Sequence, residues 1–214
     1  RLLPACPSHH FGVKSLVRIR MKQIMSASKR KKIKRERKQV QQANIEIEIK
    51  TGHEMNDDLW LIYHAFYTST FDKKSGMATL SLNFFKSIGE TLPDNILVLF
   101  AKHNDNYVAS AFCIRGDKTL YGRHWGCNTR FNNLHFELCY YQGLEYCINN
   151  GLTRFEPGAQ GEHKIYRGFL PAETWSAHWI AHPEFNTIIS KHVQHDREGM
   201  QYYIQDMQSH SPFK

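Results

Sequence analysis

The sequence predicts an α/β protein whose mixed, mostly antiparallel sheet has helices on both faces. Three apolar stretches between residues 96 and 125 are separated by short polar turns, which is typical of sequential antiparallel strands. Residues 134–150 then show helical apolar spacing, and a short strand pattern follows at 153–155. The chain therefore combines antiparallel strands with a β-α-β unit, which predicts a layered α/β fold.

Length and composition are those of a globular protein. The chain has 214 residues, of which 41% are apolar and 13% aromatic, and its formal net charge is +8. No apolar run approaches the ~20 residues that a membrane-spanning helix needs, so we expect no membrane span. Five cysteines without a CxxC pair argue against a disulfide framework and a zinc ribbon, and we expect a reducing, cytoplasmic setting.

The N-terminal part divides into an arm and a basic helix. Residues 1–24 contain prolines and no periodic pattern, and they are left as an unassigned N-terminal arm. A basic helix is predicted at 25–44, with Ser28 as a suitable N-cap and eight Lys or Arg residues among positions 29–38. Either an anionic partner faces these charges or they form a solvated surface. Residues 45–214 then form the main domain.

Strands and helices follow one another from residue 45 onward. Residues 45–50 alternate between isoleucine and charged residues, as in a half-buried strand. Helices are predicted at about 58–69 and 81–88. The strand at 96–101 is apolar throughout, so both of its faces should be covered. In the strand at 119–125, alternation places Trp125 on the same face as Tyr121 and Arg123, and opposite Leu120, Gly122 and His124.

Glu137 is the unusual residue of the helix at 134–150. It lies within the apolar stripe of the helical wheel, whereas Cys139 lies on the opposite side. A carboxylate on an apolar face needs a partner or a proton. Glu137 is therefore either a functional carboxylate or one member of a buried ion pair with an arginine such as Arg123 or Arg154.

The C-terminal part contains a predicted strand at 174–180 and a long helix at 183–208. The apolar residues of that helix recur with helical spacing, which indicates one buried side. This side is expected to include Phe185, Ile188, Ile189, Val193, Met200, Tyr203, Ile204 and Met207.

Residues 155–169 are the most polar connection in the chain and the best candidate for a site. Glycines at 158, 161 and 168 permit backbone conformations that other residues rarely adopt, and they let a ligand approach the main chain. The segment also contains carboxylates, a histidine, a lysine and an arginine. It is therefore either a solvated loop or part of a binding site.

Several of these motifs resemble a known family. The runs LYGRHWGC at 120–127, LHFE at 134–137, CYYQ at 139–142 and the whole of 155–169 resemble bacterial N-acyltransferases related to the Fem-type peptidoglycan aminoacyltransferases, which have the GNAT fold. The resemblance covers about residues 25–214. It implies a GNAT-like acyltransferase domain that corresponds to the C-terminal lobe of a two-lobed protein.

The resemblance implies transfer of an acyl or aminoacyl group to an amine, with cell-envelope precursors among the acceptors. Acyl transfer needs a base for the attacking amine and donors for the carbonyl oxygen. The candidate catalytic residues are Glu137, Glu162 and His163. The candidate substrate-binding residues are Arg123, Trp125, His135, Tyr141, Gln160, Lys164 and Arg167, and the candidate cofactor-binding residues are Gly158 and Gly161. Two groups could suggest a metal site: His135, Glu137 and Cys139, and Glu156, Glu162 and His163. Neither group contains a His pair at spacing i, i+4 or a CxxC pair, so no metal is expected.

The expected co-substrate is acyl-CoA or aminoacyl-tRNA, with no tightly bound cofactor. The glycine-rich pyrophosphate loop of GNAT enzymes is absent, because residues 126–133 contain one glycine. The partners implied are an amine acceptor, tRNA and the N-terminal GNAT-like lobe, and the C-terminal lobe alone is expected to fold without activity. The alternative is a non-catalytic RNA- or partner-binding lobe that uses the basic helix for contact.

Overall fold

The computed structural model describes residues 6–7, 12–16, 25–73, 76–158, 162–172, 175–176 and 179–213. Its strands are β1 Cys6–Pro7, β2 Gly12–Leu16, β3 Ile45–Thr51, β4 Ile96–His103, β5 Asn106–Arg115, β6 Thr119–Cys127, β7 Arg154–Glu156, β8 Leu170–Ala172 and β9 Trp175–Ser176. Its α-helices are α2 Ala27–Gln42, α3 Asp57–Asp72, α4 Leu82–Thr91, α5 Leu134–Phe136, α6 Gly143–Asn149 and α7 Pro183–Ser209. Short 3₁₀ helices are η1 Gly52–Glu54 and η3 Glu162–Arg167, and η2 Glu137–Gln142 is π-helical.

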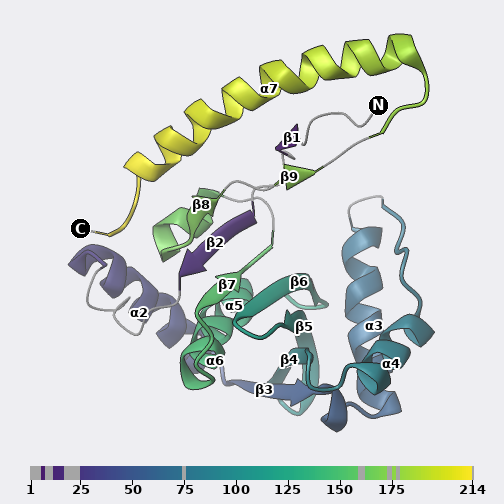
Figure 1. Ribbon diagram of the computed structural model, residues 1–214. Helices are drawn as coiled ribbons and strands as arrows, with labels where there is room; N and C mark the ends of the chain where they lie inside the picture. Colours follow the sequence, from purple (N-terminus) through teal and green to yellow (C-terminus); the bar gives the residue numbers. More distant parts are fainter. Residues whose placement is uncertain are drawn as a thin grey trace.

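The main sheet has seven strands in the order β3-β4-β5-β6-β7-β2-β8. Only β6 and β7 run parallel, and all its other neighbouring strands are antiparallel. Helices α3 and α4 cover one face, and α2, α5 and α6 cover the other (Figure 1). The predicted fold class is therefore confirmed.

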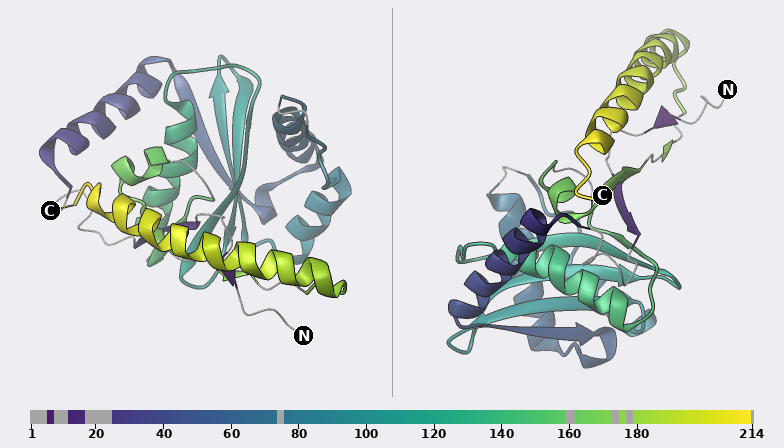
Figure 2. Two further views of the ribbon diagram at one scale, coloured as in Figure 1. Left: turned by 90° about the horizontal axis from the view of Figure 1, so that it is seen from above. Right: turned by 90° about the vertical axis from the view of Figure 1, so that its left-hand side faces the viewer.

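Strand β4 lies at the centre of two separate cores, because its side chains alternate between the two faces. Leu97, Leu99 and Ala101 pack with α2 and the α5–α6 segment, whereas Ile96, Val98 and Phe100 pack with α3 and α4. All six are at most 2% exposed, so the prediction that both faces of this strand are covered is confirmed. The left view of Figure 2 shows the sheet between the two layers of helices.

A β-bulge in β6 changes which side chains reach each core. Phe112 pairs with His124 but Cys113 pairs with Gly122, so Arg123 is the extra residue. Trp125 consequently packs with the same core as Leu120, on the α5 side. The predicted alternation, which put these two residues on opposite faces, is wrong because it assumed a regular strand.

The helix predicted at 134–150 is present, but its middle is not an α-helix. Glu137–Gln142 forms a π-helical segment, in which each turn holds more residues than an α-helical turn. Tyr140 and Tyr141 are both buried as a result, at 2% and 4% exposure. The prediction that Cys139 lies away from the buried side is also wrong, because this thiol lines a cavity in the sheet.

Helix α7 confirms the predicted C-terminal helix, but not all of its predicted buried side. Phe185 and Ile188 are 55% and 62% exposed, and the six remaining apolar positions of that side are half-buried. The helix packs on β8 and β1 and lies apart from the other helices (Figure 1). The strand predicted at 174–180 is described only at β9, since 174 and 177–178 lie outside the described residues and 179–180 are not in a strand.

The N-terminal arm, for which the sequence predicted no element, contributes two described strands. β2 lies inside the main sheet between β7 and β8, and β1 pairs with β9. Among the described helices, none is both long enough and apolar enough to cross a bilayer.

Candidate active site

A cavity of about 400 Å³ lies where β6 and β7 separate. The two strands pair only from Thr119 to Tyr121 of β6, opposite β7. Pro157, directly after β7, has no N–H with which to extend the ladder, and the bulge at Arg123 starts at the same level. The strands therefore diverge at their carboxyl ends, where α/β proteins commonly bind ligands.

The cavity reaches both faces of the sheet. On one side it is lined by Tyr67, Thr70 and Phe71 of α3. On the other side it is lined by residues of the α5–η2 segment and of η3: His135, Cys139, Tyr140, His163 and Lys164. Because the opening passes between two strands, two reactants could approach one another from opposite faces.

The hydroxyl of Tyr140 lies between two histidines of the cavity wall. Its oxygen is 2.9 Å from His163 Nε2 and 3.3 Å from His135 Nε2. A phenol has one proton to donate, so one of these bonds has the hydroxyl as donor and the other has it as acceptor. Burial raises the pKa of Tyr140 above its usual value, so the phenol stays protonated near neutral pH.

His163 is neutral near pH 7. Burial lowers the pKa of His163 below its usual value, and the positive charges of Arg167 and Lys164 lower it further. A neutral imidazole can accept a proton, whereas an imidazolium cannot. The ring is nevertheless exposed, so this histidine is reached from the solvent as well as from the cavity.

Lys164 places an amine inside the cavity wall. The residue is 3% exposed, and its Nζ donates to the carbonyl oxygen of Gly158 at 2.8 Å. Burial lowers the pKa of Lys164 to about 8. Gly158 has a φ of +85°, a conformation that favours glycine, and it lies next to Gly122 of β6.

Cys139, which lines this wall, is not activated as a nucleophile. Burial raises the pKa of the Cys139 thiol well above its usual value, so the thiol stays protonated. His135 packs its ring edge against Trp125, with the centroids 5.1 Å apart. Among the described residues, no group of three or more His, Cys, Asp or Glu side chains is arranged to hold a metal ion.

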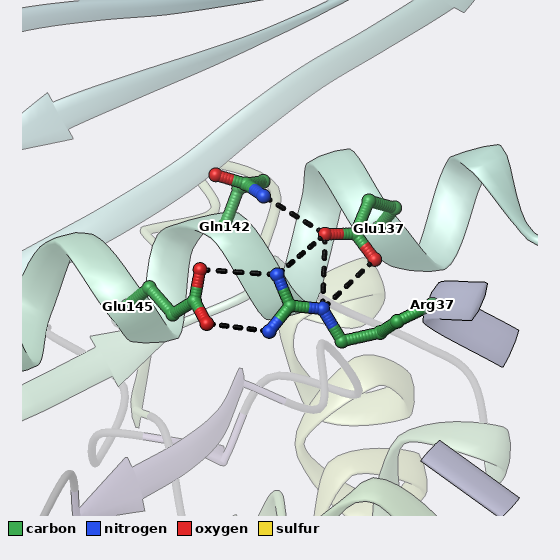
Figure 3. Close-up of polar contacts among 4 residues, drawn as sticks. All are labelled: Arg37, Glu137, Gln142 and Glu145. Carbon is green, nitrogen blue, oxygen red and sulfur yellow. Dashed lines mark hydrogen bonds and ion pairs between the residues drawn. The ribbon is translucent and has the colours of Figure 1, made fainter. Parts of the chain in front are cut away.

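Glu137 lies outside this cavity, in an ion pair between helices (Figure 3). Its carboxylate accepts from Arg37 Nη2 at 2.9 Å and from Gln142 Nε2 at 2.8 Å. Arg37 also pairs with Glu145, with Nη2 and Oε2 3.0 Å apart. The predicted partners Arg123 and Arg154 are therefore wrong, because an arginine of the basic helix occupies this position.

Arg167 and Tyr141 also lie behind the cavity, in a buried cluster. Arg167 is 5% exposed and binds Glu36 through Nη2 and Oε1 at 2.8 Å. It donates to the Tyr141 hydroxyl at 3.0 Å and to the carbonyl oxygen of His163 at 2.9 Å. The guanidinium also lies 3.5 Å from the centre of the Phe136 ring. Arg167 thus fixes the η3 backbone that bears His163.

The cavity therefore brings together six of the residues singled out from the sequence: Arg123, Trp125, His135, Gly158, His163 and Lys164. Gln160, Gly161 and the side chain of Glu162 lie outside the described residues. The sequence analysis missed Tyr67, Thr70, His124, Cys139 and Tyr140. Tyr140 stands next to Tyr141, and only the π-helical geometry distinguishes the one that reaches the cavity.

Comparison with known proteins gives one family and several similar folds. A family model described as FemAB-like, peptidoglycan biosynthesis and recognition, matches residues 21–214. No curated protein sequence matches the chain.

Solved structures show the same fold at low sequence identity. L-PGS from Bacillus licheniformis aligns with a TM-score of 0.61 and 8% identity, over 85% of this chain and 63% of that one. The C-terminal domain of a candidate lysylphosphatidylglycerol synthetase from Agrobacterium fabrum gives 0.58 and 8%, over 77% and 52%. FemX gives 0.51 and 10%, over 69% and 52%. The chain thus spans about half to under two thirds of the length of these structures.

Proposed function

Since the chain belongs to the FemAB-like family, we propose that its β6–β7 cavity is the active site of an N-acyltransferase. The enzyme transfers an acyl or aminoacyl group to an amine, and the amine belongs to a cell-envelope precursor. One observation carries the proposal: a neutral histidine, a phenol and a second histidine converge in a cavity at the carboxyl ends of the parallel strands.

The proposed step begins with the neutral amine of the acceptor. Its nitrogen attacks the acyl carbonyl carbon, a C–N bond forms, and the carbonyl oxygen becomes negatively charged. His163 takes the proton that the nitrogen loses. The intermediate then expels the oxygen or sulfur of the donor, which receives a proton from the His163–Tyr140 pair, so the pair returns to its starting state. A positioned base of this kind contributes ~10²–10⁴-fold to the rate.

The donor is aminoacyl-tRNA or acyl-CoA, used as a co-substrate and not held as a tightly bound cofactor. Residues 126–133, the end of β6 and the loop before α5, support the first of these, because they contain a single glycine, Gly126. Gly126 already has a structural role, because the backbone of Phe66 packs directly against it. The loop therefore lacks the glycines that would let a main chain wrap around a pyrophosphate.

The complete active enzyme in this proposal includes a second, N-terminal GNAT-like lobe. The chain covers 52–63% of the solved structures it resembles, which supports a larger assembly. Apolar side chains at one end of α7 are well exposed, and Phe185 and Ile188 could contact such a lobe. The chain alone is then expected to fold but to be inactive until this lobe is supplied.

The test is formation of an amide by the protein containing both lobes. Acyl donors of both kinds are offered with amine acceptors, and the product is measured by mass spectrometry. His163→Gln should reduce the rate roughly 10²-fold or more. The matched control is His53→Gln, because the exposed side chain of His53 contacts Asp94, with Nε2 and Oδ1 3.0 Å apart, and does not line the cavity. Unchanged activity of His163→Gln would exclude this histidine as the base.

A second candidate function, RNA or partner binding without catalysis, is supported by helix α2. Lys31, Lys34, Arg35 and Lys38 are exposed at helical spacing i, i+3, i+4 and i+7, so they share one face. The carboxylate and the guanidinium next to this stripe, Glu36 and Arg37, point into the protein instead. RNA binding by this stripe would weaken steeply with salt. If such binding occurs and no donor yields an amide, the non-catalytic function is favoured.

A further inference from the structure

We propose that His124 is a further catalytic residue of this cavity, and that its ring N–H stabilises the negative charge that develops on the acyl carbonyl oxygen. The inference rests on the proposed function and completes it, because acyl transfer needs a donor for this oxygen as well as a base for the amine. His124 would act from one face of the sheet and His163 from the other.

His124 lines the cavity from the α3 side. Its partner in the β5–β6 ladder is Phe112, and side chains directly opposite each other in a ladder point to the same face. Phe112 packs in the core next to α3 and α4, and the His124 ring lies edge-on to Tyr67 of α3, with the centroids 4.9 Å apart. His163 and Tyr140 line the cavity from the opposite side. A carbonyl group between the strands would therefore have an imidazole on each side.

The sheet is open next to His124. β6 pairs with β7 only as far as Tyr121, and the extra residue of the bulge, Arg123, follows before the histidine. Among the described strands, none pairs with β6 on that side beyond Tyr121. The cavity therefore opens beside the His124 backbone, and a ligand that enters between the strands meets this side chain first on the α3 side.

The ring nitrogens of His124 are available to a ligand. Among the described residues, none forms a hydrogen bond with this imidazole, although the ring is half-buried. The two hydroxyls on the same side are engaged elsewhere: Thr70 donates to the carbonyl oxygen of Trp125 at 2.7 Å, and Tyr67 accepts from the N–H of Leu80 at 3.3 Å, next to α4. A neutral imidazole has one N–H to donate, so His124 can supply the hydrogen bond that an oxyanion needs.

The surroundings keep His124 neutral near pH 7. Burial lowers the pKa of His124 below its usual value, and the positive charge of the adjacent Arg123 lowers it further. The rings packed around it are those of Tyr67, Phe85 and Phe112. An N–H held in place before the reaction needs no rearrangement of water when the negative charge appears, which is why such donors are effective.

The packing of His124 separates a catalytic role from a structural one. Because its neighbours are aromatic, a phenylalanine would fill nearly the same volume without polar atoms. A histidine places polar nitrogens in this wall instead, and such atoms cost stability when they have no partner. We therefore expect His124→Phe to keep or slightly raise the thermal midpoint while it slows the reaction.

The reaction step needs no proton from His124. The amine nitrogen forms a bond to the carbonyl carbon, and the π electron pair of the carbonyl group moves to the oxygen. The His124 N–H donates a hydrogen bond to this oxyanion. The electron pair then re-forms the C=O double bond as the oxygen or sulfur of the donor leaves. Loss of one such hydrogen-bond donor typically reduces kcat about 10²- to 10³-fold.

The first experiment measures amide formation by the protein that contains both lobes. We expect His124→Phe to lower kcat about 10²- to 10³-fold with little change in KM. His124→Asn and His124→Gln each place an amide N–H near one of the two ring nitrogens, so one of them should recover most of this loss. His64→Phe is the matched control, because His64 packs against the same rings of Tyr67 and Phe85 but does not line the cavity.

The second experiment uses the chain alone and does not depend on catalysis. Dimethylphosphinate is a tetrahedral anion that resembles the intermediate, and dimethyl sulfone is its neutral analogue. We expect dimethylphosphinate to shift the NMR signals of the His124 ring and to bind roughly 10-fold more tightly to the unaltered chain than to His124→Phe, as loss of one hydrogen bond to a charged group predicts. The sulfone should show a smaller difference. If His124→Phe does not fold, His124→Leu, which also lacks the donor, takes its place in both experiments.

The results separate this inference from the proposed function. An unchanged kcat in His124→Phe, an equal loss of kcat in His64→Phe, or equal phosphinate affinity with and without the imidazole would overturn the role of His124. Amide formation by the unaltered protein would then still support the proposed function. If the unaltered two-lobed protein forms no amide, the proposed function is contradicted, and the phosphinate comparison alone decides whether His124 binds an oxyanion.

Discussion

Tyr140 Oη lies 2.9 Å from Nε2 of His163, although 23 residues separate them in the chain. The contact joins η2 to η3, two segments that line the same side of the cavity, opposite α3. It depends on two local features, the π-helical segment that buries Tyr140 and the buried arginine that holds the His163 backbone. The proposed chemistry depends on this contact as well.

Removing the Tyr140 hydroxyl should reduce catalysis without unfolding the protein. Tyr140→Phe keeps the ring that packs against Phe169 and His135 but deletes the bond to His163. In the protein that contains both lobes, we expect kcat for amide formation to fall about 10- to 100-fold while the thermal midpoint changes little. Tyr146→Phe is the control, because Tyr146 lies in α6, directly after η2, and its hydroxyl accepts from Arg115 of β5 outside the cavity lining. Equal effects of the two variants would contradict a role for Tyr140.

Stability should rise with pH above the pKa of Lys164. The folded-state pKa of about 8 lies below the unfolded value of ~10.4, so the folded protein binds fewer protons between these limits. The free energy of unfolding should therefore gain up to roughly 3 kcal/mol from this group as pH increases from 8 to 10.5. Urea unfolding across this range checks the slope. Lys164→Met should lose that contribution, and an identical slope in the variant would show that Lys164 is not its source.

The ion pair between Glu36 and Arg167 should be far more sensitive than an exposed pair. Both side chains are at most 6% exposed, so Glu36→Gln leaves a buried guanidinium without its counter-charge. We expect a loss of about 3–5 kcal/mol in the free energy of unfolding. The control is Glu48→Gln, whose partner Lys102 is partly exposed; a surface pair contributes about 0–1 kcal/mol. Similar losses of unfolding free energy in the two variants would mean that burial does not determine how much each ion pair contributes to stability.

Two glycines should respond in opposite directions to the same substitution. A Cβ at Gly126 would overlap the backbone of Phe66, so Gly126→Ala must push α3 away from β6 and should cost about 1–3 kcal/mol or more. A Cβ at Gly199 in α7 meets nothing within 4 Å, so Gly199→Ala should stabilise the protein by about 0.5–1 kcal/mol. Chemical denaturation of both variants measures the signs, and destabilisation by Gly199→Ala would contradict the packing described for α7.

Regular periodicity explains which parts of this fold were predictable. The isoleucine alternation of β3, the apolar run of β4 and the caps Asn56 and Ser81 identify their elements directly, since each depends on residues close in sequence. The bulge at Arg123 and the π-helical turn before Gly143 interrupt those periods. Each irregularity reassigns side chains to other faces, so the positions of Trp125 and Cys139 could not be obtained from a regular strand or helix.

The other features that could not be predicted depend on ion pairs between residues far apart in the sequence. Glu36 and Arg167 are 131 residues apart, and Arg37 and Glu137 are 100 residues apart. Local sequence indicated that Glu137 needed a partner, but it did not identify Arg37, because that choice depends on how α2 packs on η2. The polar loop at 155–169 was the stronger signal: its breaker residues and its charges led to His163 and Lys164, which the cavity brings together.

The most direct test of the central claim is chemical rescue of His163. The histidine is exposed to solvent as well as to the cavity, so a small base can enter the space that its ring leaves. In the protein that contains both lobes, we expect His163→Gly to form amide at least about 10²-fold more slowly than the unaltered form, and added imidazole to restore part of the rate. A folded His163→Gly variant that keeps the original rate, or that imidazole does not rescue, would contradict the assignment of this cavity as the site of acyl transfer.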